Sequence, residues 1–222
     1  MRVLRKAGSL LVVLGALVTQ AQVAPAIDPT IQVDFSNPGL SPSHWTLILH
    51  PNGAGHFRSP TGKLPDNGMQ TMSQPAVDRD IQVSPVYANW VFAAAKSLQW
   101  FNEPCESHLK VAFQGWKTLT YTGPQARGSC SFNYSRNKGI QELGDSLQAV
   151  AETLLAGARL ELLLVHDKLG LDAEMEFLAE AVSNGQAQQI CAIRGILEQL
   201  SDDDTVMERV RKRARTLLDC QR

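Results

Sequence analysis

Beyond its N-terminal segment, this 222-residue chain has no hydrophobic run of the ~20 residues that a transmembrane helix needs. It also lacks a strong net charge, because 21 Lys and Arg residues nearly balance 22 Asp and Glu residues, for a formal charge of −1. The first absence predicts no transmembrane segment in the mature chain. The second gives no sign of a nucleic-acid-binding protein, so we expect no nucleic acid among its partners.

The common catalytic and cofactor-binding motifs are also missing. The chain contains no G-x-S-x-G nucleophile elbow, no H-E-x-x-H zinc motif, no P-loop and no G-x-G-x-x-G nucleotide fingerprint. The sequence therefore gives no motif support for a hydrolase or a nucleotide-binding enzyme. We expect no cofactor, and a protein that is not an enzyme.

The N-terminus has the pattern of a secretory signal peptide. Three cations, Arg2, Arg5 and Lys6, precede an apolar run of about a dozen residues, which is the size of a signal-peptide core and too short to span a bilayer. Small residues follow, so we expect cleavage after Ala21, with Ala26 as the second choice and an uncleaved anchor as the alternative. The mature protein, in the periplasm or outside the cell, would carry a formal charge of −4.

Four cysteines lie in the exported part, where disulfides can persist. We predict a bond between Cys105 and Cys130, because both fall at one edge of the meander described below. Cys191 and Cys220 form the other candidate pair. They lie on the last two predicted helices with an offset of about 10 Å at 1.5 Å per residue, so two buried reduced thiols remain the alternative.

Alternating apolar residues predict a sheet. We expect residues 108–134 to form a three-stranded antiparallel meander, with one apolar face made by alternate residues: Leu109, Val111 and Phe113, then Leu119 and Tyr121, then Cys130, Phe132 and Tyr134. Residues 30–35 form a further short strand, and 44–50 pairs with 55–59 in a hairpin that buries Trp45, Leu47, Leu49 and Phe57. An edge strand is expected at 80–84.

Helical spacing marks the rest. Residues 85–101 form a helix that covers the sheet, and Ile140, Leu143, Leu147, Val150 and Leu154 mark the seam of a long helix from Lys138. After a break at Gly170 come shorter helices at 172–183, 186–200 and 204–219. The expected fold class is α+β: an antiparallel sheet, made of the meander and a hairpin and covered by a helix, followed by an all-helical part. The predicted organisation is a signal peptide (1–21), a β-rich α+β domain (22–136) and an α-helical region (137–222).

Three segments are candidate binding features. Residues 59–79 are rich in proline and glycine and form a long loop that is either disordered or used for binding. His50 and His56 are predicted to face each other across the first hairpin, where they could supply two metal ligands, against the alternative of ordinary exposed histidines. Five cations near the C-terminus could contact an anionic partner, or form a solvated face paired to local acids: Arg209, Arg211, Lys212, Arg213 and Arg215.

Several stretches resemble a group of exported bacterial proteins with no assigned activity. They are HPNGAGHF (50–57), FQGWKTLTYTGP (113–124), CSFNYS (130–135), GLDAEMEFL (170–178) and VMERVRKRARTLL (206–218). The resemblance implies that the protein is exported and that its two halves are inherited together. Because the group has no assigned activity, the resemblance assigns no role to any residue.

These observations favour a non-enzymatic envelope or secreted protein that binds another protein or an envelope polymer. The alternative is a small periplasmic metal-binding protein or hydrolase that uses His50 and His56.

Overall fold

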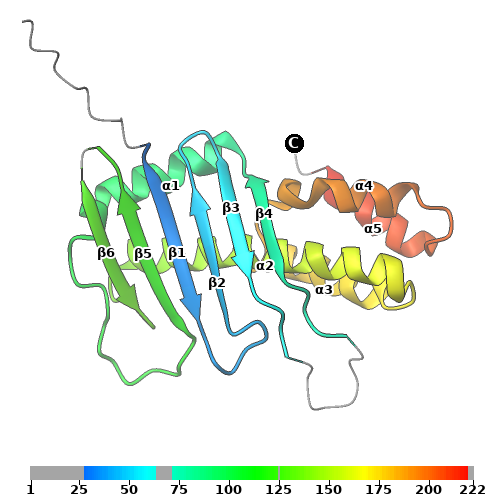
Figure 1. Ribbon diagram of the computed structural model, residues 1–222, viewed down its shortest axis with the longest axis horizontal. Coiled ribbons are helices and arrows are strands. Elements are labelled where there is room, and N and C mark those ends of the chain that lie inside the picture. The colour runs from blue at the N-terminus through cyan, green and yellow to red at the C-terminus, as the bar shows by residue number, and fades with distance from the viewer. Residues whose placement is uncertain (1–27, 64–71, 125, 220–222) are drawn as a thin grey trace, which may run out of the picture.

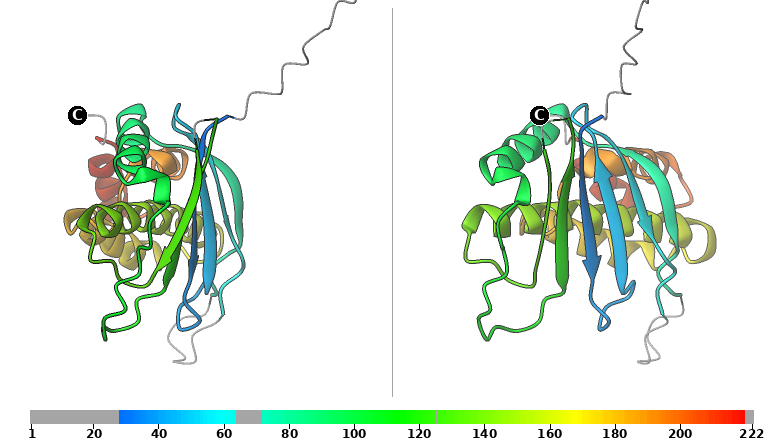
Figure 2. Two further views of the ribbon diagram at one scale, coloured as in Figure 1. Left: turned by 90° about the vertical axis from the view of Figure 1, so that its left-hand side faces the viewer. Right: turned by 60° about the vertical axis from the view of Figure 1, so that its left-hand side comes forward.

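The computed structural model describes residues 28–63, 72–124 and 126–219. They form an antiparallel sheet in the order β4-β3-β2-β1-β5-β6, with helices packed against one face (Figures 1 and 2). The fold is therefore α+β, as predicted, with its C-terminal part mostly helical. The strands are β1 (Thr30–Ser36), β2 (His44–Leu49), β3 (Ala54–Ser59), β4 (Val77–Gln82), β5 (Trp116–Thr122) and β6 (Arg127–Phe132).

Strand β1 shows why one face of the sheet is buried. Ile31, Val33 and Phe35 are buried, whereas Gln32 and Asp34 between them are partly exposed. Successive side chains of a strand point to opposite faces, so the apolar residues all lie on one side. The same alternation on the neighbouring strands makes a continuous apolar face that the helices shield from water.

The predicted meander is wrong in its first strand. Leu109, Val111 and Phe113 form no strand and are 44%, 41% and 51% exposed. Strand β5 pairs instead with β1, over seven residues from Thr30 opposite Thr122 to Ser36 opposite Trp116. The long, apolar β1 offers a better partner than residues 109–113, although these also alternate. The β5–β6 hairpin is as expected, with Leu119 opposite Cys130.

The first hairpin has a different register from the predicted one. Ile48, and not His50, lies opposite His56, because the turn closes early: the His50 N–H donates to the Ala54 carbonyl at 2.8 Å. Gly53 supplies the left-handed conformation (φ 83°) that this short turn needs. The register differs from the predicted one by two residues, so the buried face is unchanged. As predicted, it carries Trp45, Leu47, Leu49 and Phe57.

The helices follow the predicted order with shifted ends. α1 ends before η1, where Trp100 has a positive φ of 56° and breaks the helix predicted to reach residue 101. Residues 186–189 are not helical, so the helix predicted at 186–200 begins later. The helices are α1 (Pro85–Ser97), η1 (Gln99–Phe101), α2 (Lys138–His166), α3 (Leu171–Ser183), η2 (Ile190–Ile193), α4 (Arg194–Asp202) and α5 (Glu208–Leu218).

The long helix α2 is the main support of the core. It begins at Asn137, whose side-chain oxygen accepts hydrogen bonds from the backbone of Gly139 and Ile140. Its residues between Leu143 and Leu160 are mostly buried, between the sheet on one side and the C-terminal helices on the other. Buried side chains from Ile31 to Leu217 form one continuous core. The predicted boundary at 136–137 thus separates two compositions that share a single core.

Two predicted segments lie partly or wholly outside the described residues. The signal peptide (1–21) is one. The loop predicted at 59–79 is the other, since residues 64–71 are not described; its ends belong to β3 and β4, and β4 starts at Val77 rather than at residue 80. In the part of the chain that the structure describes, no helix is both long and apolar enough to cross a membrane.

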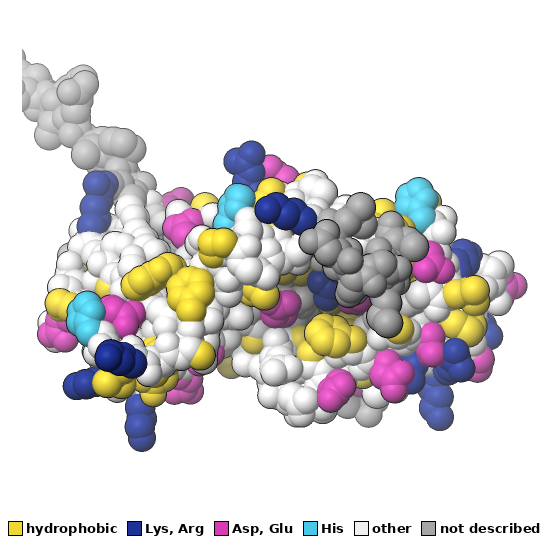
Figure 3. Space-filling model, turned by 90° about the horizontal axis from the view of Figure 1, so that it is seen from below, with side chains coloured by type: hydrophobic (Ala, Val, Ile, Leu, Met, Phe, Trp, Pro, Cys, Tyr) yellow, Lys and Arg dark blue, Asp and Glu magenta, His cyan; other side chains and the backbone are white. Residues whose placement is uncertain are grey.

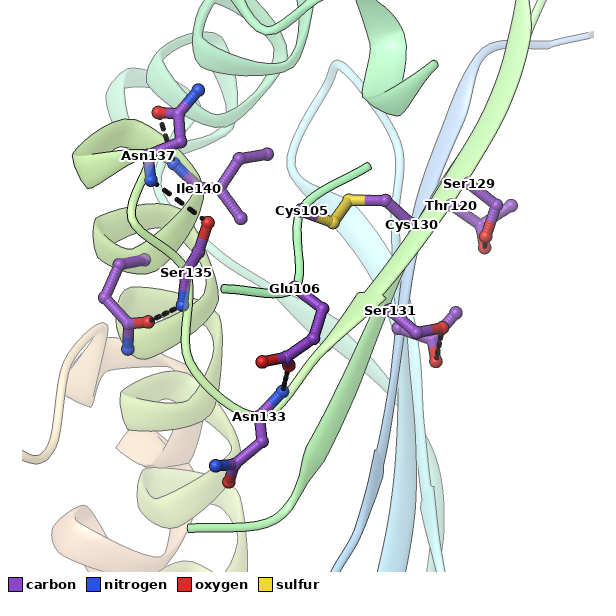
Figure 4. The surroundings of a disulfide bond; sticks show 12 residues. Cys105, Glu106, Thr120, Ser129, Cys130, Ser131, Asn133, Ser135, Asn137 and Ile140 are labelled. Atoms are coloured by element: carbon purple, nitrogen blue, oxygen red, sulfur yellow. Dashed lines mark hydrogen bonds between the residues drawn. A yellow bond between two sulfur atoms is a disulfide. The ribbon is translucent and has the colours of Figure 1, made fainter. Parts of the chain in front are cut away.

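The disulfide between Cys105 and Cys130 is confirmed, with Cα atoms 5.8 Å apart. The segment that leaves η1 runs beside β6, and Figure 4 shows the bond joining the two. The next residue, Glu106, accepts a hydrogen bond from the Asn133 backbone N–H at 2.6 Å. These bonds hold residues 105–107 against β6 without a ladder. Cys220 lies outside the described residues, so its pairing with Cys191 stays a prediction.

We expect the paired change Cys105→Ser and Cys130→Ser to lower the free energy of unfolding by about 3 kcal/mol, because it frees a loop of 25 residues in the unfolded chain. Urea titration of both proteins measures this. A reductant should destabilise the wild type more than the variant, and equal urea midpoints in the two oxidised proteins would contradict the expectation.

A buried lysine interrupts the apolar face of β5. Lys117, in series with Leu119 and Tyr121, is 1% exposed, and its Nζ lies 2.9 Å from Asp145 Oδ1 on α2 and 5.8 Å from the ring centre of Phe132. The side chain of Asp145 is 53% exposed, so the ammonium reaches a carboxylate at the protein surface. Burial of Lys117 is tolerated because its charged end is paired there.

Asp145→Asn should therefore destabilise the protein by about 1–3 kcal/mol, because it leaves a buried ammonium without its anion. Lys117→Met, which removes the charge and keeps the stem, should change stability by less than about 1 kcal/mol or raise it. Chemical denaturation tests both, with the exposed Glu142→Gln on α2 as control. If Asp145→Asn matched the control, the pair would have no structural role.

Candidate binding cleft

The two histidines predicted as metal ligands do not face each other. His50 lies at the turn, and His56 on β3 uses both ring nitrogens for Asp80 and Asp78 on β4, at 2.8 and 2.9 Å. The hydrogen bond to Asp80 raises the pKa of His56 above its ordinary value of 6.5, against the opposing effect of burial. In the described residues no group of three or more His, Cys, Asp or Glu is arranged to hold a metal ion. Whether His50 and His56 bind metal stays a prediction.

The cations of α5 have acidic neighbours. Arg209 and Arg213 both contact Asp172 on α3, at 2.8 and 2.6 Å, and Arg211 and Arg215 both contact Glu208 on their own helix. Arg213 also lies 3.7 Å from Glu176. These pairs fit the alternative of a solvated face paired to local acids. They leave the predicted contact of these cations and Lys212 with an anionic partner untested.

A cleft of about 580 Å³ opens between the C-terminal half of α2, the start of α3, the β1–β2 loop at Ser41 and the described ends of the β3–β4 connection. This volume is in the range of small-molecule sites. Figure 3 shows the molecule from below, where hydrophobic, acidic and basic side chains lie among one another over its right-hand half. The apolar part of the lining comes from Met72, Leu162, Leu163, Ala173 and Phe177.

Three polar residues from distant parts of the sequence form one side of the cleft. Arg159 on α2 donates from Nε to Glu174 on α3 and from Nη1 to Gln74, each at 2.8 Å. Gln74, which precedes β4 and is buried, donates in turn to the Leu155 carbonyl at 3.2 Å. The charge of Arg159 is thus matched by Glu174, and the three side chains fix one another in place.

Glu152 is the half-buried carboxylate of the cleft for which the structure shows no hydrogen bond or ion pair among the described residues. It lies two turns before Arg159 on the same side of α2 and lines the cleft. Burial raises the pKa of Glu152; Arg159 lowers it and Glu174 raises it, and the net effect is a pKa above 4.5. A carboxyl group with a raised pKa in a cleft is a candidate for a functional site.

The sequence analysis missed this cleft. The available signal was the pair of charges at 152 and 159, which are seven residues apart in the largely apolar stretch AVAETLLAGARLELLL, where Glu161 is the third charge. That spacing places both on one side of a helix, beside the apolar seam. Nothing in the sequence, however, brings Gln74 and Glu174 to the same place, because both contacts depend on how α3 and the β3–β4 connection pack on α2.

No model of a known protein family matches the chain, and no curated protein sequence is significantly similar to it.

Glu152→Gln should raise the free energy of unfolding at pH 7. The folded state holds a proton on Glu152 more tightly than the unfolded state does, so ionisation of this group costs stability as the pH rises through the raised pKa. The gain should shrink as the pH falls towards 4.5, where both states become protonated. Urea titrations at several pH values measure it.

The exposed Glu180→Gln on α3 is the control for this experiment, because its carboxyl group stays in water. If Glu152→Gln lowered stability at pH 7, the carboxylate would have a structural partner in the protein and would not be free for a ligand.

Proposed function

We propose that the protein is an exported, non-enzymatic binding protein of the cell envelope or the extracellular medium, and that the α2–α3 cleft is its ligand site. The observation that carries the proposal is the half-buried Glu152 carboxylate, to which no described residue donates a hydrogen bond, in a cleft of about 580 Å³. A carboxylate that is partly removed from water, with no protein donor to replace that water, is a candidate for pairing with a ligand.

Export is supported by the N-terminal pattern of cations, apolar core and small residues. The Cys105–Cys130 disulfide is compatible with an oxidising compartment. A binding role is supported by the preformed cleft, whose arginine is held by Glu174 and Gln74. The alternative, a metal protein or hydrolase using His50 and His56, has less support because Asp78 and Asp80 occupy the ring nitrogens of His56.

Expression of the full chain in a bacterium tests the export part. We expect a periplasmic or secreted product whose intact mass corresponds to cleavage after Ala21. Its mass should also be lower than that of the reduced chain by two hydrogen atoms for each disulfide. A cytoplasmic product of full-length mass, with reduced cysteines, would contradict export.

The cleft is tested by filling it. Ala173 is exposed at the mouth of the cleft, and Ala173→Phe should block entry without disturbing the core. The matched control, Ala93→Phe, adds the same ring to the exposed side of α1. We expect the small-molecule fraction of an envelope extract to raise the melting temperature of the wild type and of Ala93→Phe, and not of Ala173→Phe.

The result that would contradict this assignment is equal stabilisation of all three proteins, which would place the ligand elsewhere. The absence of any stabilisation of the wild type would count against a small-molecule binding function.

A further inference from the structure

The hydrogen-bonding groups of the cleft point to the kind of ligand that fits it. Arg159, the less exposed of the two cations that line the cleft, uses two of its five N–H groups for Glu174 and Gln74, and the amide of Gln74 donates to Leu155. Glu152, by contrast, is an acceptor without a donor among the described residues. A ligand that enters this cleft gains most by supplying N–H or O–H donors.

The charges favour a cation among such donors. Glu152, Asp167 and Glu174 give the lining three carboxylates against the two cations Arg159 and Lys63. Lys63 is exposed, so its charge is screened by water, and Arg159 is matched by Glu174. Lys63 is the cation of the lining that forms no ion pair with a described residue. An anion would be repelled by Glu152, whereas a ligand cation would pair with this carboxylate in a partly desolvated place.

The apolar lining indicates that the uncharged part of the ligand is a short apolar group. Leu162, Leu163 and Met72 line the same cleft, and Phe177 extends to its exposed mouth. Such a surface buries a short hydrocarbon stem, and an aromatic ring adds attraction for a nearby cation. The volume of about 580 Å³ suits a small molecule rather than a folded partner.

We propose that the α2–α3 cleft binds a small organic cation, an ammonium or guanidinium group on a short apolar stem, and that the Glu152 carboxylate pairs with the cationic group. This inference rests on the proposed function, because it names the ligand class of the same cleft. The recognised chemistry is the charged head and its stem, not a particular metabolite.

A series of four-carbon probes tests the head group while the stem stays constant. n-Butylammonium and n-butylguanidinium carry the cation, n-butanol is a neutral donor, and n-butyrate is an anion. Titration of each into the full-length mature protein at pH 7, followed by backbone amide NMR, reports binding through shifts at Gly170 and Ala173, which line the cleft. We expect shifts with the two cations, weaker ones with butanol and none with butyrate.

Glu152→Gln is the deciding variant, because it removes the charge and keeps the shape. It should weaken binding of both cations by about tenfold or more, the factor that a hydrogen bond to a charged group is worth. The control variant Glu180→Gln makes the same chemical change on the exposed surface of α3, outside the cleft lining, and should leave the affinity unchanged. Ala173→Phe should abolish the shifts.

Three results would overturn the inference: butanol or butyrate binding as well as the cations, cation binding that Glu152→Gln leaves intact, or no cleft shifts with either cation. Failure of the proposed function looks different. In that case the envelope extract stabilises Ala173→Phe as well as it does the wild type, or stabilises neither. The two experiments can also disagree. If the extract stabilises the wild type but not Ala173→Phe, while the probes show no preference for a cation, the proposed function stands and the cationic ligand is wrong.

Discussion

One face of the sheet is apolar, and its burial beneath α1 and α2 is the constraint on which the rest of the structure depends. Helix α2 is the longer of the two helices that cover this face, and its 29 residues span about 44 Å at 1.5 Å per residue. Six strands at about 4.8 Å spacing are only about 24 Å across. Since α2 crosses the strands, it must run past the edge of the sheet, and Figure 1 shows its C-terminal part doing so beyond β4.

This overhang explains both the C-terminal helices and the cleft. Beyond the sheet edge, α2 still has an apolar side to bury, and α3, α4 and α5 cover it. The cleft lies where α3 meets the β1–β2 loop and the chain before β4. There Arg159 joins α2 to α3 through Glu174, and to the chain before β4 through Gln74, which fixes the walls of the cleft without filling it. Glu152 lies on the same side of α2, and no described residue donates a hydrogen bond to it.

Local alternation predicted which side chains are buried better than it predicted pairing. Trp45, Leu47, Leu49 and Phe57 are buried as expected even though the hairpin register differs by two, because an even shift preserves the face. Residues 109–113 alternate equally well and are exposed. Their pattern is that of a strand, but the edge of β5 that they would occupy pairs with β1, whose residues precede their partners by 80 or more positions in the chain. No local signal decides that competition.

The disulfide and the cleft show two further limits. Cys105 and Cys130 were correctly paired from their place at one edge of a meander, yet their proximity comes from a segment that runs beside β6 without forming a strand. The cleft needs three segments, around residues 74, 152–159 and 174, whose meeting is a tertiary event. Only the helical spacing of Glu152 and Arg159 was visible in the sequence.

The most direct test of the central claim is the pKa of Glu152, measured by following its side-chain carboxyl carbon through an NMR titration of the ligand-free protein. If the carboxylate is partly buried and receives no hydrogen bond from the described residues, its pKa lies above the ordinary value of 4.5. A pKa at or below 4.5 would mean that the protein already satisfies this group, and would contradict the account of the cleft.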